Sequence, residues 1–104
     1  MEFVVICDHL PGDCPSSNAM VRKGMTESAG KLPALAKTLG IEIIFSGAPV
    51  VDHKLFFVLR ASNPEAVRDF LVTSGIVQTN TSHVYPTVSV EGALQAIAEL
   101  PPIH

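Results

Sequence analysis

The residues best suited to metal chemistry are two cysteines and two histidines. Cys7 and His9 are separated by one residue, so on a β-strand both side chains would point to the same side. Cys14 follows on the next turn, and His53 stands just before a later apolar run. Thiolate and imidazole groups are good ligands for zinc and copper. The sequence therefore offers Cys7, His9, Cys14 and His53 as metal ligands, with a zinc or copper ion as the cofactor.

The same four residues also have an ordinary structural interpretation. A cysteine on a strand is often a small core residue, and histidines are frequently found at wet loop edges. The spacing does not decide between the two interpretations, because the chain has no close CxxC or HxxxH pair. A metal site requires that the fold bring the end of the first strand to the start of a later one.

A second set of polar residues is suited to acid–base chemistry and ligand binding. Histidine exchanges protons near neutral pH, so His83 and His9 are the candidate catalytic residues. His83 lies in residues 76–85, a predicted strand that is polar on both faces and either meets solvent or lines a water-filled pocket. Glu42 and Arg60 could bind a ligand in that pocket, or they could instead form a structural ion pair across the sheet. The ligand-binding candidates are Glu42, Arg60, Thr79 and Tyr85.

These residues must be positioned by elements that the apolar pattern predicts. β-Branched and aromatic runs predict strands at 2–9, 41–50, 55–61 and 76–85. Apolar residues at intervals of three and four predict a helix over 20–39, which Pro33 should kink or divide. A second helix is expected over 63–75, because Asn63-Pro64-Glu65 is typical of a helix start and Gly75 of a helix end. A last short helix begins at Ser89.

This order of elements has one compact solution with right-handed crossovers. The predicted class is α+β and ferredoxin-like: an antiparallel sheet in the strand order 4-1-3-2, both long helices on one face, and an extra C-terminal helix. Phe3, Val5 and Cys7 are expected on the uncovered face, which is partly apolar and therefore typical of an interface. The helix-facing residues that alternation predicts are Val4, Ile6, Ile41, Ile43, Phe45, Leu55, Phe57 and Leu59.

In its element order and strand patterns, nearly the whole chain resembles the dimeric α/β-barrel superfamily of ferredoxin-like proteins. That group includes small monooxygenases, muconolactone isomerases and haem-degrading enzymes. The resemblance implies a homodimer whose two sheets pack face to face around a cavity for a small molecule. It also implies an isomerase- or monooxygenase-like enzyme with His83 or His9 as the acid–base group. An accessory module that docks a larger partner without a ligand is a further alternative.

The composition and charge of the chain restrict the classes of protein to which it can belong. The 104 residues are 47% hydrophobic and 16% charged, which suits one domain over 1–104 with its own core. A net charge of −3 argues against a nucleic-acid partner, because such proteins present a concentrated basic surface. No apolar run approaches the ~20 residues of a membrane span. The first residues lack the basic region of a signal peptide, so we expect a cytoplasmic protein with reduced cysteines and no membrane partner.

Overall fold

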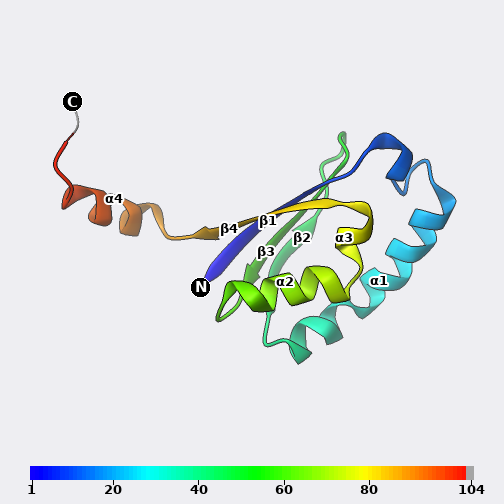
Figure 1. Cartoon of the computed structure of the whole chain (residues 1–104), viewed down its shortest axis with the longest axis horizontal. Helices are drawn as coiled ribbons and strands as arrows, with labels where there is room; N and C mark the ends of the chain where they lie inside the picture. Colours follow the sequence, from blue (N-terminus) through cyan, green and yellow to red (C-terminus); the bar gives the residue numbers. More distant parts are fainter. Residues whose placement is uncertain (103–104) are drawn as a thin grey trace.

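The computed structural model describes residues 1–102 and contains a four-stranded antiparallel sheet with its helices (Figure 1). The strands are β1 (Glu2–Asp8), β2 (Glu42–Gly47), β3 (Lys54–Arg60) and β4 (Thr81–Thr87). The helices of this part of the chain are α1 (Ala19–Thr38), α2 (Pro64–Thr73), α3 (Ile76–Thr79) and α4 (Val90–Ala98), with a 3₁₀ turn at Pro11–Asp13. The predicted α+β class is confirmed, and the architecture is compatible with a ferredoxin-like fold.

The strands lie in the order β2-β3-β1-β4, and every neighbouring pair is antiparallel. This is the predicted order 4-1-3-2 counted from the other edge, so that prediction is confirmed. Helices α1 and α2 cover the same face, because one alternate set of strand side chains packs with buried residues of both helices. The principal members of this core are Phe3, Val5, Phe57, Leu59, Ala36, Val67 and Phe70.

Local signals explain where the helices begin and end. The Asn63 side chain accepts a hydrogen bond from the Ala66 N–H at 2.9 Å, and Pro64 opens α2 as predicted. Gly75 follows α2 with φ of 83°, a left-handed conformation that suits glycine. Helix α1, in contrast, continues through Pro33 and is not divided there. The lost backbone hydrogen bond is outweighed because residues on both sides of Pro33 pack against the core.

The first strand faces the helices with the opposite side from the one predicted. Phe3, Val5 and Cys7 are fully buried in the core, whereas Val4 and Ile6 are only partly buried. Residues directly opposite in an antiparallel pair share a face, and Phe3 and Val5 pair with the helix-facing residues of β3. Alternation within β1 alone did not carry this information, because both of its phases are apolar.

A bulge corrects the prediction for β2. The β2–β3 register shifts between Ile43 and Phe45, so the residues on its two sides no longer follow one alternation. Ile43 packs against the core, as predicted, but Phe45 is 54% exposed and lies opposite Val58. We call the face away from α1 and α2 the open face of the sheet. Its apolar residues are Val4, Ile6, Phe45, Phe56 and Val58.

The fourth strand starts later than predicted. Residues 76–79 form the short helix α3 and β4 begins at Thr81, whereas the sequence predicted a strand from Ile76. The left-handed Gly75 turns the chain, and the buried Ile76 anchors the new turn. Asn80 closes this turn, because its side-chain amide donates to the Ile76 carbonyl at 3.1 Å. As a result, Asn80 lies beside the end of β1.

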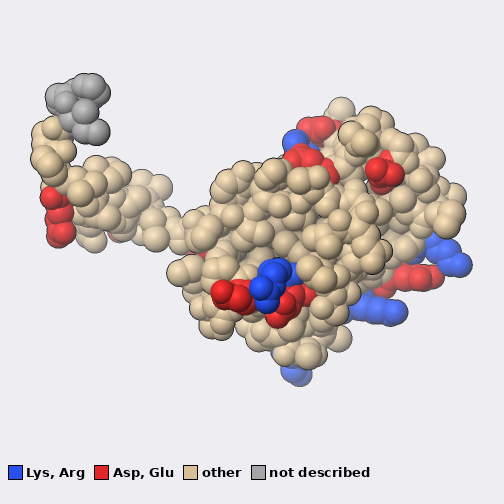
Figure 2. All heavy atoms as spheres, viewed as in Figure 1, with Lys and Arg blue, Asp and Glu red and all other residues tan. Residues whose placement is uncertain are grey.

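Helix α4 begins at Ser89, as predicted, with the Ser89 hydroxyl accepting from the Gly92 N–H at 2.9 Å. It stands away from the rest of the chain, to which a narrow connection joins it (Figures 1 and 2). None of residues 90–98 is buried. Within residues 1–102, the helices are too short or too polar to cross a membrane.

The core assignment predicts how two positions of α2 respond to truncation. Phe70 is fully buried and meets Phe57 edge to face at 6.0 Å, so Phe70→Ala should lower the free energy of unfolding by about 3–5 kcal/mol. Val72 on the same helix is 56% exposed, and Val72→Ala should change that free energy by less than about 0.5 kcal/mol. Urea unfolding measures both. Equal losses would contradict the assignment.

Candidate metal centre

His9, Cys14 and His53 come together at one end of the sheet. His9 directly follows β1, His53 directly precedes β3, and Cys14 follows the 3₁₀ turn. One ligand atom from each, an imidazole nitrogen or the cysteine sulfur, lies within 4.8 Å of the other two. Ligands of a tetrahedral zinc ion are roughly 3.5 Å apart, as metal–ligand bonds of 2.0–2.3 Å require. Small side-chain rotations therefore suffice to close the three residues around one ion.

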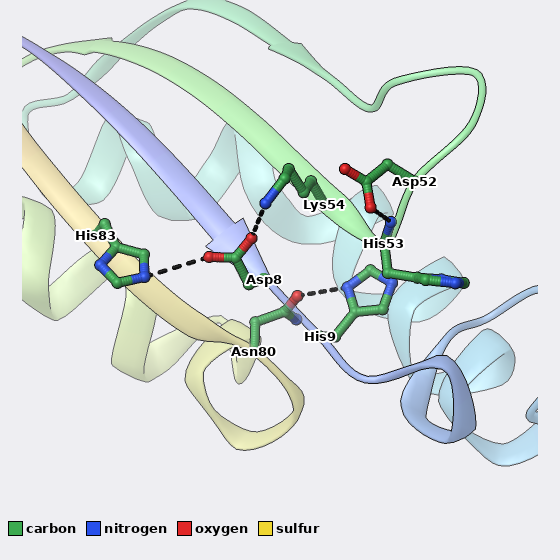
Figure 3. A network of polar contacts seen from close by, with 7 residues as sticks. All are labelled: Asp8, His9, Asp52, His53, Lys54, Asn80 and His83. Carbon is green, nitrogen blue, oxygen red and sulfur yellow. Dashed lines mark hydrogen bonds and ion pairs between the residues drawn. The ribbon is translucent and has the colours of Figure 1, made fainter.

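The backbone holds the two histidines side by side. The His9 N–H donates to the His53 carbonyl at 3.1 Å, which continues the β1–β3 pairing beyond the last strand residues. The two rings meet edge to face with centroids 5.7 Å apart. Asp52, just before His53, has φ of 144°, a conformation that L residues rarely adopt. The Asp52 carboxylate accepts from the His53 N–H at 2.7 Å and so fixes this turn (Figure 3).

Asn80 orients the ring of His9. The Asn80 side-chain nitrogen donates to the Ile76 carbonyl and the Thr79 hydroxyl, both at 3.1 Å, so its oxygen is the atom that faces His9. That oxygen lies 2.8 Å from His9 Nδ1 and accepts its hydrogen (Figure 3). Nε2 of His9 then carries the free lone pair. Metal-binding histidines are typically oriented by such a hydrogen bond to the second ring nitrogen.

Cys14 is buried and its thiol is activated. The Ser16 hydroxyl donates to Cys14 Sγ at 3.0 Å. This hydrogen bond, with smaller contributions from the Ser16 backbone, His53 and His9, lowers the pKa of Cys14 to about 6. The thiolate therefore predominates at neutral pH. A thiolate is the form of cysteine that binds metals.

The loop that carries Cys14 is tied to the start of α1. The Asn18 side chain accepts from the Val21 N–H and donates to the Gly12 carbonyl, both at 3.1 Å. The Arg22 guanidinium donates to two loop carbonyls, those of Pro15 at 2.7 Å and Ser16 at 3.0 Å. These contacts fix the position of the cysteine before any ligand arrives, which reduces the entropy lost on binding.

Two imidazole nitrogens in this group lack a hydrogen-bond partner. His9 Nε2 and His53 Nδ1 are buried, and no group within residues 1–102 donates to or accepts from them. Buried polar atoms are nearly always paired, so two unpaired nitrogens beside a thiolate need an explanation. A metal ion would satisfy both. Two nitrogens and one sulfur form a donor set that suits zinc or copper.

Cys7, the fourth predicted ligand, does not join the group. Its side chain points into the core, where Sγ lies 3.3 Å from the Ser82 hydroxyl, and burial raises its pKa. Residues two apart along a strand lie about 6.6 Å from each other, so Cys7 sits deeper in the core than His9 and outside the group. Three of the four predicted ligands are thus brought together. Asn80 and Ser16 were missed, because neither residue has a distinctive spacing relative to the ligands.

The candidate catalytic residue His83 lies on the open face near this end of the sheet. Its Nε2 is 3.2 Å from the Asp8 carboxylate, which also pairs with the Lys54 ammonium (Figure 3). Chiefly because of the hydrogen bond from Lys54, the pKa of Asp8 is lowered. His83 is not part of the His9–Cys14–His53 group. His83, Asp8 and Lys54 form a separate polar cluster, and Asp8 directly precedes His9 in the sequence.

The predicted ligand-binding residues are dispersed. Arg60 and Glu42 form an ion pair at 2.7 Å at the far end of β3 from His53, and both side chains are more than half exposed. Exposed pairs of this kind contribute little to stability. Tyr85 lies on the open face opposite Val4. Thr79 was predicted on the fourth strand but lies in α3, where its hydroxyl accepts from Asn80.

No protein-family model and no curated protein matches the chain. The function is therefore inferred from the geometry and chemistry of the residues themselves.

The contacts of Cys14 predict its titration. Because hydrogen bonds to Sγ stabilise the thiolate, Cys14 should ionise near pH 6, whereas the buried Cys7 should stay protonated at neutral pH. Ser16→Ala removes the largest contribution and should move the Cys14 titration to higher pH. Thiolate absorbance near 240 nm, recorded against pH in the metal-free protein and in a Cys7→Ala variant, measures this. A titration of Cys14 that Ser16→Ala leaves unchanged would contradict the assignment.

Proposed function

We propose that this chain is a metal-binding protein that takes one zinc or copper ion at His9, Cys14 and His53. The observation that carries the proposal is the pair of buried, unpaired imidazole nitrogens beside a low-pKa thiolate. Each of the three residues offers an atom that can coordinate a metal: a buried, unpaired nitrogen on each histidine and a sulfur whose pKa is lowered to about 6. Coordination of an ion would give both nitrogens the partner that they lack within residues 1–102.

Three protein ligands leave a coordination position of the ion open. Structural zinc sites are almost always closed by four protein ligands, whereas sites that exchange or activate a small molecule keep one position for water or substrate. The donor set here therefore favours a sensing, transfer or catalytic role over a purely structural one. His9 also borders a surface pocket that α3 and the 3₁₀ turn help to form.

Metal binding and its dependence on single ligands test this proposal. The metal-free full chain should bind one zinc ion, measured by calorimetry against a competing chelator. Cys14→Ser and His53→Ala should each weaken binding by more than about 100-fold, since even residues that only support a ligand are worth 10–100-fold. Affinity should also fall as the pH drops below about 6, because the Cys14 thiolate, whose pKa is lowered to about 6, then becomes protonated.

Two matched variants separate ligation from general damage. Cys7→Ala removes the other thiol, from the core, and should leave zinc affinity unchanged. Asn80→Ala removes the group that orients His9 and should weaken binding by about 10–100-fold. Undiminished binding in Cys14→Ser, or an equal loss in Cys7→Ala, would overturn the proposed ligand set.

A second candidate function is small-molecule binding on the open face, enclosed by a second copy of the chain. It is favoured by the Asp8–His83 pair, an acid–base couple beside the apolar residues Ile6 and Phe56. In that case His83 would exchange protons with the bound molecule, as in an isomerase- or monooxygenase-like enzyme.

Native mass spectrometry of the untagged protein purified from cells distinguishes the two candidates. For the metal-binding function we expect an added mass equal to one zinc or copper ion per chain. An organic mass that disappears in a His83→Gln variant would instead support the small-molecule function. Retention of that organic mass by His83→Gln would contradict the role of His83.

A further inference from the structure

Helix α4 exposes an apolar stripe that nothing within residues 1–102 covers. Val90, Leu94 and Ile97 recur at intervals of four and three, so they share one side of the helix. They are 76, 60 and 59% exposed. The stripe stands on an arm that leaves the sheet at the end of β4 and extends the molecule to 54 Å along its longest axis (Figure 1).

A helix of this length does not persist in water by itself. Isolated helices shorter than about 12–15 residues are marginal, and α4 has nine. Its Ser89 cap contributes only about 1 kcal/mol. Most of the stability of a short amphipathic helix comes from packing its apolar side against another surface. For α4, such packing would have to come from a surface other than residues 1–102 of its own copy.

The open face of the sheet is a matching surface on the same chain. Its centre is apolar, with Phe56, Val58, Val4 and Ile6 in neighbouring rows, and ion pairs lie at its two ends. A nine-residue helix is about 13 Å long, and four strands spaced about 4.8 Å apart span about 14 Å between the outer two. One helix thus crosses the width of the sheet. Being about 10 Å wide, it would leave the Asp8–His83 end uncovered.

We propose that α4 packs on the open face of a second copy, so that two chains exchange their arms about a two-fold axis. The chain carries both halves of the contact, and a two-fold axis forms the contact twice in a single association. The open face of each copy then covers the apolar stripe of its partner's α4, and its own α4 covers the open face of the partner. The proposal does not depend on metal binding at His9, Cys14 and His53.

The oligomeric state of two full-length variants tests the exchange. The wild type should be a dimer by light scattering at micromolar concentration. Leu94→Glu combined with Ile97→Glu places charges on the stripe and should produce a monomer. Gln95→Glu, on the opposite side of α4, should remain a dimer. A monomeric wild type, or a double variant that stays dimeric, would overturn the proposal.

Cross-linking identifies the surface that α4 contacts. A photoreactive phenylalanine analogue replaces Leu94 in a mixture of isotopically light and heavy full-length chains. Light-to-heavy cross-links should form to peptides of β1 and β3. Links within one chain only, or links to α1 or α2 of the partner, would contradict the docking surface. Zinc binding by the double variant should match that of the wild type, which keeps this test separate from that of the metal site.

Discussion

The pairing of β1 with β3 is the constraint on which the rest of the structure depends. Its register places Asp8 opposite Lys54, and the next residues along, His9 and His53, then share a backbone hydrogen bond. The same register directs Phe3 and Val5 to the helices with their partners on β3. A slip by one residue would exchange the two faces of the strand, so core and candidate site depend on the same alignment.

The candidate site combines a rigid frame with unsatisfied donor atoms. Asn80 holds the ring of His9 in place, and hydrogen bonds from Asn18 and Arg22 hold the loop that carries Cys14. Two buried imidazole nitrogens nevertheless remain unpaired within the described part of the chain. Leaving such atoms without partners costs about 1–3 kcal/mol each, which coordination of an ion would offset. The two cysteines show the same contrast: burial raises the pKa of Cys7, whereas the hydrogen bond from Ser16 lowers that of Cys14.

Much of the fold could be predicted from the sequence because its signals are local. Asn63-Pro64, Gly75 and Ser89 mark helix ends through their own hydrogen bonds or backbone preferences, and the order of elements restricts the strand order. Features that depend on a neighbouring strand could not be predicted in this way. The inward side of β1 is set by its partners on β3, and the bulge at Phe45 exists only as a relation between two strands.

The candidate site, like the fold, could be predicted from the sequence only in part. Residue chemistry pointed to His9, Cys14 and His53, but it pointed equally to Cys7, whose depth in the core the strand pattern alone does not reveal. Asn80 became visible only when α3 placed it beside His9. Supporting residues of this kind are ordinary in type and remote in sequence, so they emerge only from the folded arrangement.

X-ray absorption spectroscopy of the full chain loaded with one equivalent of zinc tests the metal assignment most directly. We expect one sulfur at about 2.3 Å and two imidazole nitrogens at about 2.0–2.1 Å, with the remaining position filled by a light atom. The sulfur contribution should disappear in Cys14→Ser and persist in Cys7→Ala. A first shell without sulfur, or one that loses its sulfur in Cys7→Ala, would contradict the proposed metal centre.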